Sequence, residues 1–316
     1  MAKGNESMRI LYIANHGCGH NDDEGSIKFA LESLGHKVKT VHEKHAHTAE
    51  SLSFDFALYH KLDNPELIAK LKKTGPIVFW YFDLVNTLLR GREPKIERRN
   101  QSRIEWMAAM RKVASLGFCT DGDWVVESPR RLDSCDLIQL SQGFDERLLM
   151  PADHPDRIKP KQFDIYFPGT IKNCGTAREN WLRDMERNYG KRFRWSVEAF
   201  REDCRHEVDQ CHIAIAPPFP ITDRYYSNRV YNLCGYGAPV MHPYSAALTR
   251  EYEPGKEIML YQDQSEMHAG IDTMLSQPEY FQHIGQNAQL RTMKDHTYRH
   301  RCERLIETVK DRFDIC

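Results

Sequence analysis

Short, nearly continuous apolar segments alternate with longer stretches of mixed polarity along most of the chain. A continuous apolar segment is typical of a strand that is buried on both faces of a sheet. In the first half this pattern predicts strands at residues 8–14, 37–41, 54–60, 76–83, 115–120 and 136–140. Residues 26–34 have helical character and end before Gly35, a common helix terminator. Strands that alternate with helices indicate a parallel, doubly wound α/β sheet.

The second half repeats this rhythm after a polar, proline-rich break at residues 152–161. Its strands are predicted at residues 163–167, 192–197, 212–216, 238–242 and 257–261. Its helices are predicted at residues 176–189, 198–209, 229–234, 264–275, 278–293 and 296–313. We therefore expect two Rossmann-like domains, at residues 8–150 and 163–295, with a linker at residues 151–162 and a C-terminal helix within residues 296–316.

Composition narrows the class of protein. A chain of 316 residues is long enough for two domains, and 44 Lys and Arg against 45 Asp and Glu argue against a general polyanion binder. No apolar run approaches the roughly 20 residues of a membrane span, and the N-terminus lacks a signal-peptide core. The nine Cys are scattered without a paired framework, which favours reduced thiols in a cytoplasmic protein.

The most informative segment is residues 226–241, which reads as a loop, a helix that ends at glycine, and a buried strand. Ser227, Asn228 and Arg229 surround the predicted helix start. A helix N-terminus carries unpaired N–H groups and a partial positive charge, so it suits an anionic ligand. Arg229 adds a fork of donors that matches a phosphate.

This segment resembles the donor-binding segment of glycosyltransferases with two Rossmann-like domains, the GT-B fold, and most closely the group-1 branch that includes spore-maturation CgeB-like proteins. The linker sequence at residues 142–151, the pairing of Arg178 with Trp181, and the ending at residues 295–301 are similar to the same family. The resemblance is weaker over residues 8–140. It also departs at Asn232, where the family usually has Glu.

The resemblance implies two domains that face a central cleft, with a nucleotide-sugar bound by the second. We expect the diphosphate at the turn of Gly169 and Thr170, with Lys172 and Arg178 as neutralising cations and Ser227, Asn228 and Arg229 at the helix start. Pro217, Tyr226 and Asn232 would contact the nucleoside and sugar. For Arg178 the alternative is an exposed helix charge. Asn232 retains hydrogen-bonding capacity but no charge, which leaves the donor open.

Further candidate residues follow strands of the first domain. Gly17 and Gly19 are candidate donor-binding residues because they allow close backbone approach to a phosphate or sugar, although a lone Gly-x-Gly is weak evidence. His20 and Asp22 are candidates for a base or for orienting an acceptor hydroxyl, with a tight polar turn as the alternative. Asp83 ends an aromatic strand, and we expect it to hold an acceptor hydroxyl or to act as the base.

The stretch at residues 90–112 is locally basic. Arg92, Lys95, Arg99 and Arg103 recur at helical spacing, which predicts either a solvated helix face or a groove for a polyanionic acceptor. Some two-domain glycosyltransferases of phages modify hydroxymethylated bases, so DNA is one candidate acceptor. A bacterial or phage-infected cell is the setting that this resemblance implies.

The predicted function is transfer of a hexosyl or pentosyl group from a nucleotide-sugar, with UDP-sugars favoured, to an acceptor hydroxyl. The resembled fold needs no metal, and we expect no cofactor besides the nucleotide-sugar, which is a co-substrate. The histidines of residues 42–47 read as surface residues and not as a metal site. The rivals are a non-catalytic nucleotide-binding protein of the same fold and a nucleic-acid-binding module built on residues 90–112. The oligomeric state, the sugar and the stereochemical outcome stay open.

Overall fold

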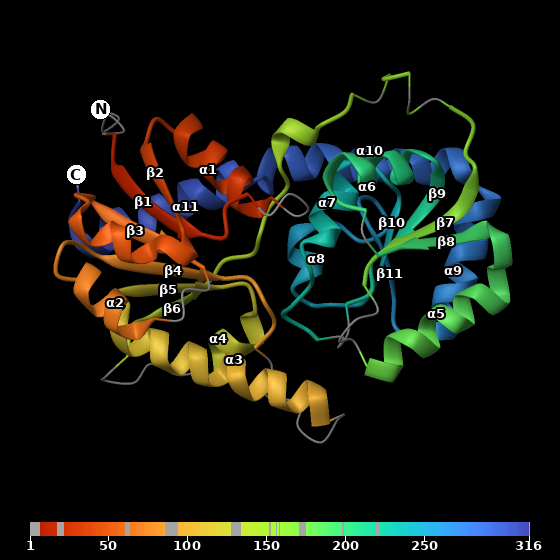
Figure 1. Cartoon of the computed structure of the whole chain (residues 1–316). Coiled ribbons are helices and arrows are strands. Elements are labelled where there is room, and N and C mark those ends of the chain that lie inside the picture. The colour runs from red at the N-terminus through yellow and green to blue at the C-terminus, as the bar shows by residue number, and fades with distance from the viewer. Residues whose placement is uncertain are drawn as a thin grey trace. The chain divides into compact units, whose positions relative to one another are not determined.

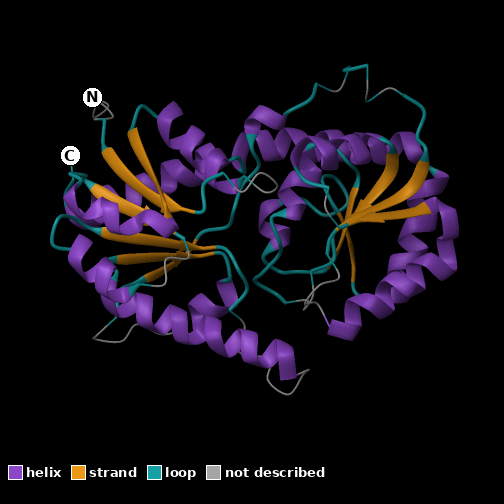
Figure 2. Cartoon of the chain, viewed as in Figure 1, coloured by secondary structure: helices purple, strands orange, loops and turns teal. Residues whose placement is uncertain are grey.

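The computed structural model describes residues 7–17, 22–60, 64–85, 94–127, 134–151, 153–155, 157, 159–170, 175–197, 199–218 and 222–315. Contacts divide the chain into two compact units. Unit 1 comprises Met1–Arg90, Glu97–Gln142 and Tyr298–Cys316, and unit 2 comprises Gly91–Ile96 and Gly143–Thr297. Figure 1 labels the elements of both units, and Figure 2 separates strands from helices.

Unit 1 is built on a six-stranded sheet with the order β2-β1-β3-β4-β5-β6. All neighbouring strands are parallel. The strands are β1 (Arg9–Ala14), β2 (Lys37–His42), β3 (Phe56–Tyr59), β4 (Ile77–Tyr81), β5 (Leu116–Cys119) and β6 (Leu137–Gln139). The helices are α1 (Asp23–Ser33), η1 (Glu43–Ser51), α2 (Pro65–Leu71), α3 (Pro94–Val113), α4 (Gly122–Glu127) and α11 (Tyr298–Phe313). The first three residues of α3 are assigned to unit 2.

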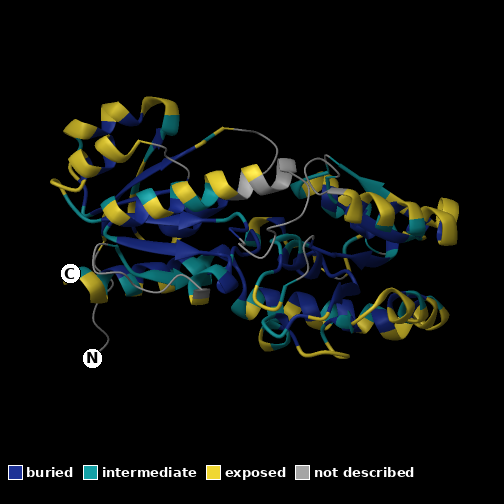
Figure 3. Ribbon diagram, turned by 90° about the horizontal axis from the view of Figure 1, so that it is seen from below, coloured by how far each residue is buried: buried dark blue, intermediate teal, exposed yellow. Residues whose placement is uncertain are grey.

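Alternation along each strand of unit 1 fills two hydrophobic clusters, one on either face of the sheet. Ile10 and Tyr12 of β1 enter one cluster, and Leu11 and Ile13 enter the other. The inner strands β1, β3, β4 and β5 are accordingly buried, while the outer faces of the helices are exposed (Figure 3). A sheet covered on both faces is the doubly wound arrangement that the apolar runs predicted.

Unit 2 has a five-stranded sheet with the order β11-β10-β9-β7-β8, also parallel throughout. Its strands are β7 (Phe163–Pro168), β8 (Phe193–Ser196), β9 (Cys211–Ile215), β10 (Val240–Pro243) and β11 (Met259–Tyr261). Its helices are η3 (Glu146–Leu148), α5 (Gly175–Tyr189), η4 (Gly190–Arg192), α6 (Arg201–Asp209), α7 (Arg229–Gly235), α8 (Leu248–Glu251), α9 (Gln264–Ser276) and α10 (Pro278–Asp295). Each strand predicted from the sequence is present, with ends that differ by one or two residues.

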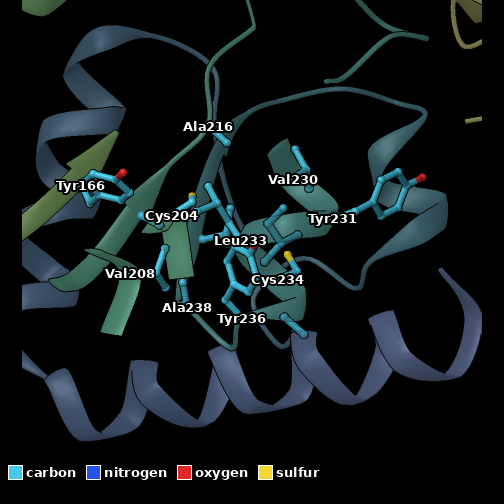
Figure 4. Close-up of a cluster of buried hydrophobic side chains, with 14 of the residues drawn as sticks. Tyr166, Cys204, Val208, Ala216, Val230, Tyr231, Leu233, Cys234, Tyr236 and Ala238 are labelled. Atoms are coloured by element: carbon cyan, nitrogen blue, oxygen red, sulfur yellow. The ribbon is translucent and has the colours of Figure 1, made fainter. Parts of the chain in front are cut away.

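The helix α7 is fixed by a buried cluster and by its glycine terminus. Val230, Leu233 and Cys234 lie among buried side chains of the sheet, as Figure 4 shows. Gly237 ends the helix with φ 82°, a conformation that favours glycine. A Cβ at Gly285 of α10 would lie 2.5 Å from the carbonyl oxygen of Gly237, so α10 packs closely against this end of α7. This packing sets the place of the residues at the start of α7.

The C-terminal helix α11 belongs to unit 1, although the chain reaches it from unit 2. It packs against α1, and its buried residues Tyr298, Cys302, Leu305, Ile306 and Val309 recur at helical spacing. The Tyr298 hydroxyl donates a 2.6 Å hydrogen bond to Asp23 at the start of α1. The segment at residues 298–313 therefore completes the core of unit 1.

Candidate functional site

Two arginines of unit 2 flank one aromatic ring at the carboxyl end of β7. The guanidinium carbons of Arg178, near the start of α5, and Arg229, at the start of α7, lie 5.5 Å and 5.0 Å from the centre of the Phe167 ring. Phe167 is fully buried, and Arg178 is only 4% exposed. Positive groups over an aromatic face gain from its quadrupole. The structure thus brings together two cations that are far apart in the sequence.

Backbone carbonyl groups orient both arginines. Arg178 donates from Nη1 to Thr170 O at 2.7 Å, and the carbonyl oxygen of Pro217 lies 3.5 Å from both Arg178 Nη2 and Arg229 Nη1. Arg229 Nη1 also lies 3.5 Å from Ser227 Oγ. Carbonyl oxygens, a hydroxyl and an aromatic face orient a guanidinium group. The exposed alternative for Arg178 is therefore wrong, because this side chain is buried and held.

Gly169 leaves the space that this cluster needs. A Cβ there would lie 2.5 Å from the Phe167 ring and 3.0 Å from Arg229 Nη2. Its N–H donates to Ser196 O at 2.9 Å, which fixes the turn. Glycine at this position therefore lets the ring and Arg229 approach the backbone after β7. The predicted residues Gly169, Thr170, Arg178, Pro217, Ser227 and Arg229 gather at one place in unit 2.

Other predicted donor residues differ in their surroundings. Tyr226 is 3% exposed, and its hydroxyl lies 2.9 Å from that of Tyr231, so its side chain is part of the interior. Asn228 is the residue before α7, and its side chain makes no capping hydrogen bond to the helix. Asn232 is half-buried on the same helix. Lys172 lies outside the described residues.

His242 is a residue of this region that the sequence did not reveal, because it is hidden in the apolar run of β10. It is fully buried, and its Nδ1 lies 2.6 Å from Pro243 O. Its Nε2 has no hydrogen-bond partner among the residues that the structure describes. Burial, together with the charge of Arg229, lowers the pKa of His242 to about 4, while the hydrogen bond to the Pro243 carbonyl opposes the shift. The ring is therefore neutral at pH 7, with Nδ1–H donating and Nε2 available as an acceptor.

In unit 1, Asp83 follows β4 and forms an ion pair with Arg103 of α3, with Asp83 Oδ2 3.2 Å from Arg103 Nη2. Arg103 also donates to Leu84 O at 2.8 Å and is only 16% exposed. It therefore does not belong to a solvated basic face. Arg111 is 5% exposed and donates to Cys135 O, so it too lies in the interior.

The remaining candidates of unit 1 lie around the loop after β1. Asp22 is the residue before α1, where its Oδ1 accepts a 2.9 Å hydrogen bond from Gly25 N–H. Gly17 adopts φ 86°, which favours glycine. Gly19 and His20 lie outside the described residues, as does Arg92, and the side chains of Lys95 and Arg99 are likewise not described. The capping bond gives Asp22 a structural role.

No helix in the described part of the chain is long and apolar enough to cross a membrane. No group of three or more His, Cys, Asp and Glu side chains within that part is arranged to hold a metal ion. The rings of His42, His45 and His47 follow one another at 6.1 Å and 6.4 Å between centres.

Residues 161–307 match the family model described as "Glycosyl transferase-like". This range is somewhat less than half of the chain, and it contains the whole arginine cluster and His242. No curated protein matches the chain in sequence.

Solved structures with a similar fold cover nearly the whole chain. Sucrose-phosphate synthase (tll1590) from Thermosynechococcus elongatus has a TM-score of 0.71 and 12% identity, over 97% of this chain and 99% of that one. An alpha-glucosyltransferase in complex with UDP-glucose and DNA containing an abasic site has a TM-score of 0.66 and 10% identity, over 96% of this chain and 100% of that one. Anabaena Alr3699/HepE in complex with UDP-glucose has a TM-score of 0.64 and 13% identity, over 96% of this chain and 100% of that one. The chain therefore has the two-domain GT-B fold of glycosyltransferases, as predicted, while the CgeB-like branch stays a prediction.

Proposed function

We propose that this chain is a glycosyltransferase that moves a sugar from a nucleotide-sugar, with UDP-sugars favoured, to an acceptor hydroxyl. The observation that carries the proposal is the pair of guanidinium groups, Arg178 and Arg229, held around Phe167 beside the Gly169 turn. The family match over residues 161–307 supports the same class of activity. The spore-maturation CgeB-like branch is our finer assignment.

The chemistry of sugar transfer explains the two cations. The acceptor oxygen forms a bond to the anomeric carbon, and the bond from that carbon to the phosphate oxygen breaks with its electron pair. Negative charge therefore builds on the departing diphosphate. Preorganised guanidinium groups stabilise that charge most where water is excluded, as burial of Arg178 favours. We accordingly propose transfer without a divalent metal, which predicts full activity in excess chelator.

The other donor contacts follow the same logic. Asn232 and Pro217 are proposed to face the nucleoside and sugar, with Tyr226 as a support of the loop. The turn and helix start add Thr170, Ser227 and Asn228, and the further predicted donor contacts are Gly17, Gly19 and Lys172. Neutral His242 is a new candidate for accepting a hydrogen bond from a donor hydroxyl or N–H. The nucleotide-sugar is a co-substrate, and no other cofactor is proposed.

On the acceptor side, Asp83 is the first candidate for taking the proton of the attacking hydroxyl, with His20 and Asp22 as the alternatives. Asp83 has a side chain that is 34% exposed and paired with Arg103, so an acceptor has access to it. A hydroxymethylated pyrimidine in DNA is the most concrete acceptor. Its support is the solved alpha-glucosyltransferase complex that contains DNA, together with the exposure of Arg98 on α3.

The test is a donor panel of UDP-, ADP-, GDP- and CMP-sugars, read by thermal stabilisation and by release of the nucleoside diphosphate. A ligand that binds the folded state raises its melting temperature. We expect a UDP-sugar to stabilise the wild type, and Arg229→Ala to lose this stabilisation. Arg183→Ala is the matched control, since Arg183 lies on α5 but is 71% exposed. Binding without any release of nucleotide indicates the non-catalytic rival, and absence of binding across the panel refutes the proposal.

A further inference from the structure

We propose that Asp121 is a positioning residue for the acceptor side of this enzyme: it holds the segment of residues 83–85, and with it the Asp83 carboxylate, at the carboxyl edge of the sheet of unit 1. The inference rests on the function proposed above, in which Asp83 meets the acceptor. It adds a residue that neither the sequence patterns nor the family match singles out, because the match begins at residue 161.

One carboxylate joins two neighbouring strand ends. Asp121 lies two residues after β5 and is fully buried. Its Oδ2 accepts a 2.8 Å hydrogen bond from Val85 N–H, on the loop after β4. Its Oδ1 accepts a 3.1 Å hydrogen bond from Trp124 N–H in the first turn of α4. The backbone that follows Asp83 is therefore tied to the start of α4 through a single side chain.

A second side chain, on α3, holds the same segment. Arg103 of α3 pairs with the Asp83 carboxylate at 3.2 Å and donates to Leu84 O at 2.8 Å. Where β4 ends, Thr120 N–H donates to Tyr81 O at 3.0 Å. Each of the three consecutive residues Asp83 to Val85 is thus bonded to a charged side chain. Such restraint is what a catalytic carboxylate on a loop requires, because displacement by about 1 Å costs on the order of a hundredfold in rate.

The two hydrogen bonds require the ionised form of Asp121. A carboxylate accepts through both oxygens, whereas a protonated carboxyl group turns one oxygen into a donor, which cannot accept from the facing N–H. Burial and the charge of the Asp123 carboxylate raise the pKa of Asp121 to about 6, against the opposing hydrogen bonds from the backbone N–H groups of Trp124, Val85 and Asp123. Cys119 on β5 interacts electrostatically with both Asp121 and Asp83, and Asp83 is paired with Arg103.

The burial of Asp121 allows an experiment to distinguish a positioning role from a purely structural one. The folded-state pKa of Asp121 lies above the ordinary value, so the stability it contributes is present at low pH and is lost as pH rises toward 6. At pH 7.5 the buried charge of Asp121 lowers the stability of the folded state. If Asp121 had only a structural role, its replacement would change the stability of the fold and leave the rate of reaction unchanged. A positioning residue would lose rate on the same replacement.

The experiment compares Asp121→Asn and Asp121→Ser with the wild type, using UDP-glucose as the probe donor. Asparagine turns an NH2 group toward one of the two N–H donors, and serine keeps the cap on α4 while being too short to reach Val85. We expect both variants to lower kcat about tenfold or more with the KM for the donor unchanged. We also expect the acid limb of kcat near pH 6 to disappear, and the Tm at pH 7.5 to be unchanged or raised in Asp121→Asn.

Asp55→Asn is the matched control. Asp55 lies before β3, and it also accepts from a backbone N–H, that of Arg9, as well as from the Arg9 guanidinium group. We expect this variant to lower the Tm and leave kcat and its pH profile unchanged.

Hydrogen–deuterium exchange supplies a readout that does not depend on activity. The amide of Val85 should lose protection in both Asp121 variants and keep it in Asp55→Asn. Unchanged protection of Val85, or a wild-type kcat and pH profile, overturns the positioning role. If the Val85 amide loses protection in the Asp121 variants but the wild type turns over no donor, the hold of Asp121 on residues 83–85 is supported and the proposed transferase activity is contradicted. Asp121→Ser keeps the test decisive if Asp121→Asn fails to fold.

Discussion

Gly169→Ala tests whether the space beside Arg229 is part of the binding site. The added methyl group would lie 2.5 Å from the Phe167 ring and 3.0 Å from Arg229 Nη2. Both distances are too short, and the ring is fully buried, so the ring or the arginine has to move. Forcing an extra carbon into a packed site costs about 1–3 kcal/mol.

The expected consequence falls on ligand binding. Displacement of Arg229 weakens a charge-assisted contact worth about 1.5–3 kcal/mol, which corresponds to about a tenfold to hundredfold loss of affinity. Isothermal titration with a UDP-sugar gives that loss directly, and urea unfolding gives the cost to the fold. We expect both to change, with the affinity reduced about tenfold or more.

Gly270→Ala is the control within the same unit. A Cβ at Gly270 in α9 would lie 2.6 Å from the terminal methyl group of Met241, a flexible atom that is able to move away. Alanine is also favoured over glycine inside a helix. This variant should therefore keep full donor affinity and at least wild-type stability. If Gly169→Ala binds the donor as tightly as the wild type does, the cluster around Phe167 is not the diphosphate site.

Three further predictions concern Asn232, His242 and the basic residues of α3. Asn232→Glu should change donor preference or affinity in a donor panel, because it restores the residue that the resembled family usually has; an unchanged panel would remove Asn232 from the site. The folded-state pKa of His242 is about 4, below its ordinary 6.5, so stability should be lost as pH falls from 6.5 toward 4, by about 3 kcal/mol at most. His242→Gln should flatten this loss in urea unfolding, and an equal loss in both proteins would contradict it. Arg98→Gln combined with Lys112→Gln should weaken DNA binding and reduce its salt dependence if α3 carries a DNA acceptor, and identical salt slopes would exclude that role.

The fold was predictable because the information is local. Runs such as residues 8–14 and 163–167 are apolar throughout, and the parallel strands found there are buried on both faces. Gly35 and Gly237, which both have positive φ, lie just after the helices whose ends they were expected to mark. The predicted ends of strands were less accurate. Asp83 was placed inside a strand, but it follows β4 and pairs with Arg103.

The site was predictable only in part, because its geometry depends on contacts between distant residues. Arg229 and Gly169 were expected near the same ligand from the resemblance, and the structure places them in contact range. Nothing local distinguishes Arg103, whose partner is 20 residues earlier, from a solvated helix charge. His242 and Asp121 were missed because burial, not sequence context, makes their polar atoms informative.

Arg178 and Arg229 are proposed to act together on the diphosphate of a nucleotide-sugar. A double-mutant cycle measured by isothermal titration with UDP-glucose tests this directly, using Arg178→Ala, Arg229→Ala and the combined variant, with Arg183→Ala as the control. We expect each single variant to lose about tenfold or more in affinity and the control to bind as the wild type does. The combined loss should differ from the sum of the two, because both arginines contact Pro217 O and Phe167. Equal affinity of the wild type and all three site variants for UDP-glucose would contradict this proposal.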